Sequence, residues 1–112
     1  MNAEVSLSNP SAGYFDVVTI ENIEDKNCFS YADYEGFLCE MCVYEDGLIL
    51  FRQGKDHLLE LHLKEEKYAK ITSAEGSCKL DVKVVDFMID SDILVLHYLI
   101  DDEERIIKIK YY

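Results

Sequence analysis

Hydrophobic and polar residues alternate with a period of two through most of this chain, which is the pattern of half-buried β-strands. The segment from Lys79 to Val84 is the clearest case, because Leu80, Val82 and Val84 alternate with charged neighbours. Turn residues interrupt the alternation at roughly the 8–12-residue spacing of all-β domains. The pattern predicts nine strands, at about 14–22, 27–34, 37–45, 48–53, 57–63, 67–73, 78–90, 92–100 and 105–112.

The breaks in this pattern predict how the strands connect. Asp46-Gly47 is typical of a two-residue type I′ hairpin turn, in which both central residues need a positive φ. The alternation changes phase between Val84 and Val85, which predicts a β-bulge there. A short helical turn is expected near Tyr31 to Glu35. Short hairpins throughout favour an all-β, antiparallel up-and-down barrel of about 8–9 strands, because closure removes exposed edges.

The length of 112 residues fits one domain. Residues 1–13 are rich in Asn, Ser, Pro and Gly, so we expect a flexible tail at 1–13 and a single barrel domain at 14–112. The chain begins without the basic and apolar regions of a signal peptide, and no apolar run reaches the ~18 residues of a membrane span. The sequence therefore predicts a soluble, cytoplasmic protein.

Charge is the most lopsided feature of the composition. The chain has 11 Lys and Arg against 23 Asp and Glu, a formal net charge of −12. Such a chain repels phosphate backbones and anionic lipid headgroups, so neither nucleic acid nor a membrane surface is an expected partner.

The segment Ile93–Ile100 is apolar on both faces. Only one face can enter a barrel, and a bare second face would leave an apolar patch on the surface. Either the N-terminal tail or a second copy of the chain must cover it. The tail is mostly small and polar, so the sequence predicts a homodimer.

The cysteines and histidines give no metal site. Cys39 and Cys42 form a CxxC pair, but residues three apart on a strand point to opposite faces. His57 and His62 also face opposite ways, although Glu60 shares a face with His62. In a reducing cytoplasm all four cysteines are expected as free thiols. We therefore expect no metal and no other cofactor.

No catalytic motif is present, neither a nucleophile elbow nor a phosphate-binding glycine loop, so the protein is not expected to be an enzyme. The Asp46-Gly47 turn would place Val43 opposite Leu50 and Met41 opposite Arg52, with all four on one face. If that face is the interior, Arg52 is an inward cation. It could meet a ligand carboxylate, or pair with an acidic neighbour at the rim, and the abundance of acids favours the pair. The candidate ligand-binding residues are Arg52, Met41, Leu50, Tyr98 and Lys110.

Strand and turn residues from Phe29 to Tyr112 resemble the YwiB-like family of small bacterial proteins. The matching pieces are Tyr31 with its acidic followers, Gly36, Glu45-Asp46-Gly47, Arg52-Gln53-Gly54, Ile71-Thr72 with Gly76, Lys79 to Val84, the Tyr98 strand and Ile109-Lys110-Tyr111. The chain departs from the family pattern in a short N-terminus and in the region from Gly54 to Lys70. The resemblance implies a calycin-type (lipocalin-like) β-barrel and supplies no catalytic residues.

Two functions fit such a barrel. The first is a non-catalytic module whose interior or mouth binds a small, largely apolar molecule or a carboxylate. The second is a structural or protein-interaction module with a barrel filled by its own side chains, acting through a dimer or partner surface. The volume of the interior separates them, because the large residues Phe29, Phe37, Met41, Phe87 and Tyr111 could fill a barrel this short.

Overall fold

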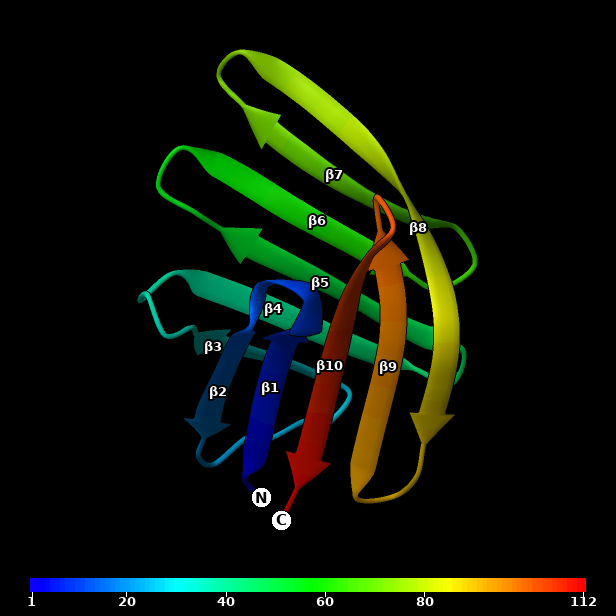
Figure 1. Ribbon diagram of the computed structural model, residues 1–112. Coiled ribbons are helices and arrows are strands. Elements are labelled where there is room, and N and C mark those ends of the chain that lie inside the picture. The colour runs from blue at the N-terminus through cyan, green and yellow to red at the C-terminus, as the bar shows by residue number, and fades with distance from the viewer.

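Ten antiparallel strands form one sheet that curls into a nearly closed barrel (Figure 1). The computed structural model describes residues 1–112, apart from the side chain of Tyr14. The all-β, antiparallel architecture is as predicted, with slightly more strands than the 8–9 expected. The strands are β1 (Ala3–Asn9), β2 (Tyr14–Ile20), β3 (Cys28–Ala32), β4 (Leu38–Tyr44), β5 (Gly47–Gln53), β6 (His57–Leu63), β7 (Lys67–Ser73), β8 (Gly76–Ile89), β9 (Ile93–Ile100) and β10 (Glu103–Tyr111).

The strand order in the sheet is β2-β1-β10-β9-β8-β7-β6-β5-β4-β3. From β3 to β10 each strand is a hairpin partner of the next, and β1 then pairs with β10. The chain ends therefore lie side by side in Figure 1, where Asn2 and Tyr112 exchange backbone hydrogen bonds with N···O distances of 2.7 and 2.9 Å. Strands β2 and β3 are the two edges of the sheet, and the segment between them connects these edges. In this segment the Lys26 carbonyl accepts a hydrogen bond from the Tyr111 hydroxyl at 2.8 Å.

Strand β8 is the corner of the barrel. Its first half pairs with β7 and its second half with β9, so the long strand in Figure 1 curves from one wall to the other. The register with β9 shifts between Val84 and Asp86. This irregularity confirms the bulge predicted from the phase change, and it lets Val84 and Phe87 both turn inward.

The first residues are not the flexible tail that we expected. Ala3–Asn9 forms β1, which pairs with both β10 and β2 and buries Ala3 and Val5 almost completely. A period-two pattern is present, since Ala3, Val5 and Leu7 alternate with polar residues. The small side chains and the following Asn-Pro-Ser-Ala-Gly turn hid it. Because β1 is a wall of the barrel, it does not cover the outer face of β9.

The hairpin between β4 and β5 is shifted by two residues from its predicted register. Tyr44 pairs with Gly47, so Glu45 and Asp46 form the turn and Met41 lies opposite Leu50. A shift of two keeps every side chain on its predicted face. Glycine is required at position 47 because an added Cβ would lie 1.8 Å from the Leu63 carbonyl oxygen of β6. The reason for the glycine is this close approach of two backbones, and a type I′ turn is not involved.

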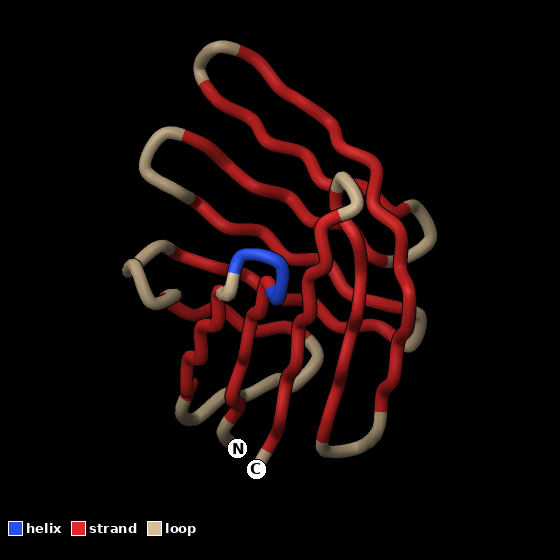
Figure 2. The backbone as a smooth tube through the Cα atoms, in the orientation of Figure 1, coloured by secondary structure: helices blue, strands red, loops and turns tan.

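The helical turn expected near Tyr31 to Glu35 is also absent from the described backbone. Asp33 instead closes a turn after β3, where its Oδ1 accepts hydrogen bonds from the amides of Glu35 (3.0 Å) and Phe37 (2.8 Å). The assigned helical structure is a short 3-10 turn, η1 (Pro10–Ala12), between β1 and β2 (Figure 2). No helix in the described chain is long and apolar enough to cross a membrane.

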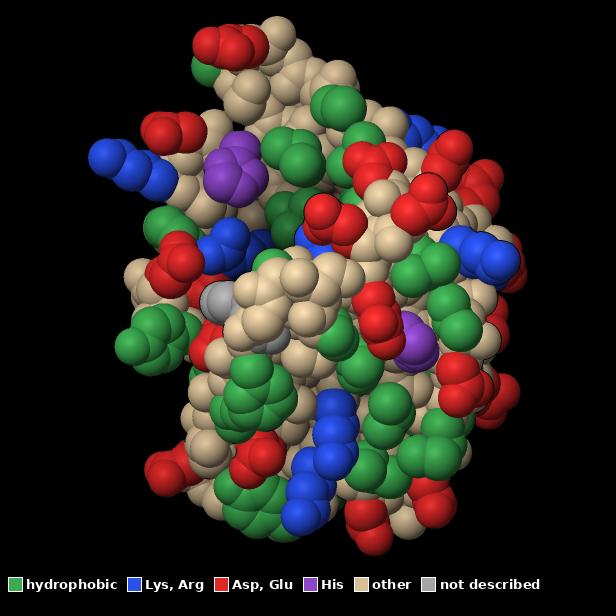
Figure 3. Space-filling model, in the orientation of Figure 1, with side chains coloured by type: hydrophobic (Ala, Val, Ile, Leu, Met, Phe, Trp, Pro, Cys, Tyr) green, Lys and Arg blue, Asp and Glu red, His purple; other side chains and the backbone are tan. Residues whose placement is uncertain are grey.

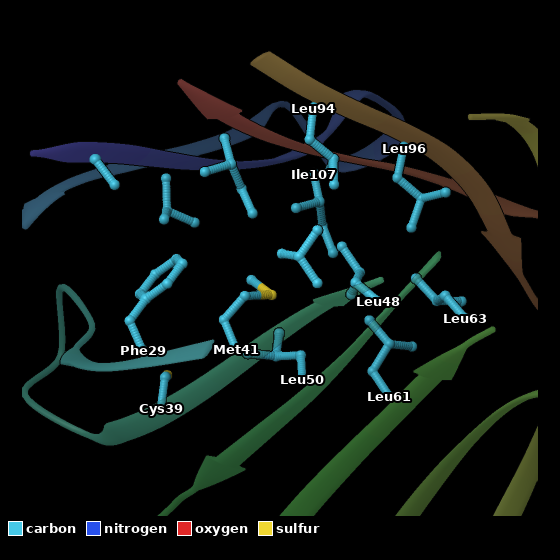
Figure 4. Close-up of a cluster of buried hydrophobic side chains, with 14 of the residues drawn as sticks. Phe29, Cys39, Met41, Leu48, Leu50, Leu61, Leu63, Leu94, Leu96 and Ile107 are labelled. Carbon is cyan, nitrogen blue, oxygen red and sulfur yellow. The ribbon is translucent and has the colours of Figure 1, made fainter. Parts of the chain in front are cut away.

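The core fills one end of the barrel. Side chains from the β3–β6 wall point toward side chains from β9 and β10 in Figure 4. The alternation of β9 decides which of its two apolar faces enters the core. Leu94, Leu96 and Tyr98 turn inward, while the side chains between them stay half-exposed. Residues that are at most 2% exposed are Ala3, Val5, Cys39, Met41, Leu48, Leu63, Ala69, Leu94, Leu96, Ile107 and Ile109.

Candidate functional site

The other end of the barrel holds a pocket of about 370 Å³. It opens between the η1 turn and the β9–β10 hairpin on one side and strands β5 to β8 on the other. Figure 3 shows the molecule hollowed there, with hydrophobic side chains inside and basic ones at the border. The pocket is lined by Leu7, Ser8, Asn9, Leu50, Arg52, Leu59, Leu61, Ala69, Ile71, Leu80, Tyr98, Ile100, Arg105 and Ile106. Its wall is therefore aliphatic, with a few polar groups, which is the make-up of small-molecule sites.

The pocket exists because the inward side chains do not meet at this end. Phe29, Met41 and Tyr111, three of the large residues that could fill the barrel, lie in the core. Phe87 is half-buried and packs against that core. Phe37 is half-buried in the turn after β3 and belongs to neither the core nor the pocket wall, and the Arg52 guanidinium lies 4.8 Å from its ring centre. The barrel is thus filled at one end and hollow at the other.

Arg52 lines the pocket, so the face that it shares with Met41 and Leu50, which the sequence left open as inner or outer, is the inner one. Its Nε contacts Asp33 Oδ2 at 2.5 Å and its Nη2 contacts Glu35 Oε2 at 3.3 Å. Burial lowers the pKa of Arg52, but the hydrogen bond and charge of Asp33, together with the charge of Glu35, raise it above its usual value. The rim ion pair that the acidic composition favoured is confirmed, and two carboxylates compensate this cation.

The other candidate residues lie in different places. Leu50 and Tyr98 line the pocket with Arg52. Met41 is fully buried in the core, on the inward face but away from the pocket wall. Lys110 is exposed on the outer face of β10 opposite Ile93, so its amine does not line the pocket.

Arg105 is a pocket residue that the sequence reasoning missed. It lies directly opposite Tyr98 in the β9–β10 register, so both side chains point inward. Its Nη2 contacts Glu103 Oε2 at 2.9 Å, and the Glu103 side chain is 58% exposed. The signal that could have found Arg105 is this cross-strand register, which follows once Asp101 and Asp102 are taken as a two-residue turn.

Two cysteines are bonded, contrary to the expectation of four free thiols. Cys28 of β3 and Cys42 of β4 are cross-strand partners with a Cα–Cα distance of 4.2 Å, and the structure joins them in a disulfide. The expectation rested on the compartment, whereas the pairing brings the two thiols together on the outer face. Cys39 points to the other face and is buried, which raises the pKa of its thiol. The CxxC pair is therefore split between two faces, as predicted.

One group of metal-ligand type lies within 4.8 Å among the described residues: Cys28, Glu40 and Cys42. Two of its three donors are the bonded sulfurs, so it offers a single carboxylate. His62 lies 3.6 Å from Glu60 on the outer face, between the rings of Phe51 and Tyr68. His97 Nε2 lies 2.8 Å from Glu104 Oε1. These contacts are pairs on the outer wall and do not assemble a further ligand set.

Comparisons with known proteins add little to this geometry. No family model and no curated protein matches the chain. Among solved structures, the crystal structure of the ywiB protein from Bacillus subtilis matches with 12% sequence identity and a TM-score of 0.37, covering 99% of this chain and 89% of that one. That protein is of the family that the sequence resembles. At this level of similarity the match carries no argument about function.

Proposed function

We propose that the protein is a non-catalytic, cytoplasmic binding module that takes one small, largely apolar molecule into the open end of its barrel. The observation that supports this function is the pocket of about 370 Å³ with its aliphatic wall. This volume lies near the lower end of the roughly 300–1,000 Å³ typical of small-molecule sites. An apolar guest gains free energy there because its surface and that of the wall leave water together.

The volume also sets the size of the guest. A water molecule occupies ~30 Å³ in the liquid, and we take this volume for each non-hydrogen atom of the guest with its hydrogens. A pocket of about 370 Å³ then holds about twelve non-hydrogen atoms. A neutral probe of this size is 1-decanol. Isothermal titration calorimetry should show saturable binding of one decanol per chain, with the negative heat-capacity change that accompanies apolar burial.

The matched variants place the same bulky residue inside and outside the pocket. Leu59 lines the pocket and is half-buried, so Leu59→Trp should occupy the cavity and weaken decanol binding by at least about tenfold. Val85 is 51% exposed at the bulge of β8, so Val85→Trp should bind as the unchanged protein does. Decanol binding that survives Leu59→Trp, or no binding to the unchanged protein, would contradict the proposal.

A further inference from the structure

The polar groups of the pocket suggest which end of a guest they would hold. Arg52 and Arg105 both line it, and they differ in how far their charge is already compensated. Arg52 contacts two carboxylates, and the Asp33 side chain is only 8% exposed. Arg105 contacts one, on Glu103, whose side chain is 58% exposed. An ion pair with a solvated partner contributes little to stability, so Arg105 is the cation that can change partner at small cost.

Tyr98 supplies a second polar group beside Arg105. Tyr98 is 5% exposed, lines the pocket and lies directly opposite Arg105 in the strand register. Burial raises the pKa of Tyr98, against the smaller lowering effect of the Arg105 charge, so the hydroxyl keeps its proton at neutral pH. A protonated phenol hydroxyl is a hydrogen-bond donor, so it could donate to an acceptor group of a ligand in the pocket.

The β9–β10 hairpin fixes these two groups relative to each other. Asp101 and Asp102 both have positive φ, 50° and 62°, as a two-residue type I′ turn requires. Ile100 then pairs with Glu103, and two residues further from the turn Tyr98 pairs with Arg105. Facing side chains on one side of an antiparallel pair have Cβ atoms about 4.5–5.5 Å apart. One acceptor group can therefore meet both donors.

We propose that the guest is an amphiphile with one carboxylate, whose two oxygens accept from the Arg105 guanidinium and the Tyr98 hydroxyl while its alkyl part lies along the aliphatic wall. This inference rests on the proposed function and specifies its ligand class. A carboxylate suits the pair because guanidinium–carboxylate hydrogen bonds are charge-assisted and about twice as strong as neutral ones. On binding, Arg105 would exchange Glu103 for the ligand, and Glu103 would turn to water.

The test compares decanoate with 1-decanol, probes of equal alkyl length, by calorimetry at pH 8. The unchanged protein should bind decanoate about tenfold more tightly than decanol. Arg105→Gln should bring this ratio to about one, because decanoate loses the charged partner of its carboxylate. Tyr98→Phe should lower it in part. Lys110→Gln, which removes an exposed cation outside the pocket, is the control and should keep the ratio.

A second variant does not depend on how well Arg105→Gln folds. Glu103→Gln removes the competing carboxylate at an exposed position, so decanoate affinity should rise about twofold to threefold with decanol affinity unchanged. Equal affinities for the two probes in the unchanged protein would overturn the proposal, as would a ratio lost in Arg52→Gln and kept in Arg105→Gln. Binding of neither probe would contradict the proposed function itself, whereas decanol binding without a preference for decanoate contradicts only this inference.

Discussion

Three tyrosine hydroxyls and one thiol lie within the barrel wall, where water cannot stabilise their charged forms. Burial raises the pKa of Tyr31, Tyr98, Tyr111 and Cys39 above the ordinary values of these groups. In the folded protein each of these groups therefore keeps its proton at a high pH at which the unfolded chain releases it. The stability linked to these protons is fully present below the unfolded pKa values, ~8.5 for Cys and ~10 for Tyr, and is lost as the pH rises above them.

We expect the free energy of unfolding to fall steeply above about pH 10. Each buried tyrosine should contribute ~1.4 kcal/mol per pH unit between its unfolded and folded pKa values. Urea denaturation at pH 8, 10 and 10.5 measures the slope. Tyr98→Phe removes one titrating group and should make the slope shallower, whereas Tyr34→Phe, at a side chain 81% exposed, should leave it unchanged. A slope that is the same in Tyr98→Phe would contradict the assignment.

For single residues, the sequence predicted the strand face of a side chain better than the residues that it contacts. Alternation placed Arg52 and Leu50 on one shared face, and the excess of acids indicated that Arg52 pairs with one of them. Lys110 was also named as a candidate, but the alternation of its strand turns it outward. Arg105 was missed because it follows four acidic residues and resembles part of a solvated turn. The position of Arg105 in the pocket depends on the register between β9 and β10. An uncertainty of two residues in the turn between these strands is enough to hide that register.

At the scale of elements, nine strands were recognisable because their side chains are large and alternate. The bulge in β8 was recognisable because it changes that phase. Strand β1 was missed because Ala3, Val5 and Ser6 bury little area each, and its stability comes from pairing with β10, a partner far away in the sequence. Local pattern carries no information about such a long-range pairing. The Cys28–Cys42 bond was missed for a different reason, because the expectation of free thiols rested on the compartment and not on the β3–β4 register.

Gly47 provides a test of one such contact. Gly47→Ala should lower the free energy of unfolding by more than about 3 kcal/mol, because the new Cβ would overlap the Leu63 carbonyl and push β5 from β6. The matched control is Gly76→Ala, which also has a positive φ (131°) but meets nothing within 4 Å. It should cost only the ~1–3 kcal/mol of backbone strain. Equal losses in the two variants, measured by urea denaturation, would show that the close approach to β6 is unimportant.

At the scale of the whole molecule, the outer face of β8, β9 and β10 remains without a cover in the chain itself. Ile93, Val95 and Leu99 are half-exposed there, and Met88 is 49% exposed. Figure 3 shows hydrophobic side chains on this face among acidic and basic ones. Since β1 is part of the barrel wall, the homodimer inferred from this two-faced strand stays a prediction, now with an assigned surface.

We expect sedimentation at tens of micromolar to show a dimer that strengthens with added salt, because each subunit carries −12 and salt screens the repulsion. Val95→Lys should give a folded monomer. Leu96→Lys is unsuitable, because Leu96 is 1% exposed in the core. The control is Leu38→Lys, at a 63% exposed leucine on β4 outside this face, which should remain dimeric. A monomer in moderate salt would contradict the prediction.

The adjacency of the two chain ends has a consequence for how fast the barrel forms. Every strand pairing in the sheet order joins consecutive strands except β1 with β10. That pairing brings together residues near opposite ends of the chain, so it bears the largest loop-closure entropy. A peptide link between Asn2 and Tyr112, already hydrogen-bonded to each other, would turn it into one more hairpin. The contact order would then fall. The free-energy barrier to folding that comes from closing the β1–β10 pairing would fall with it.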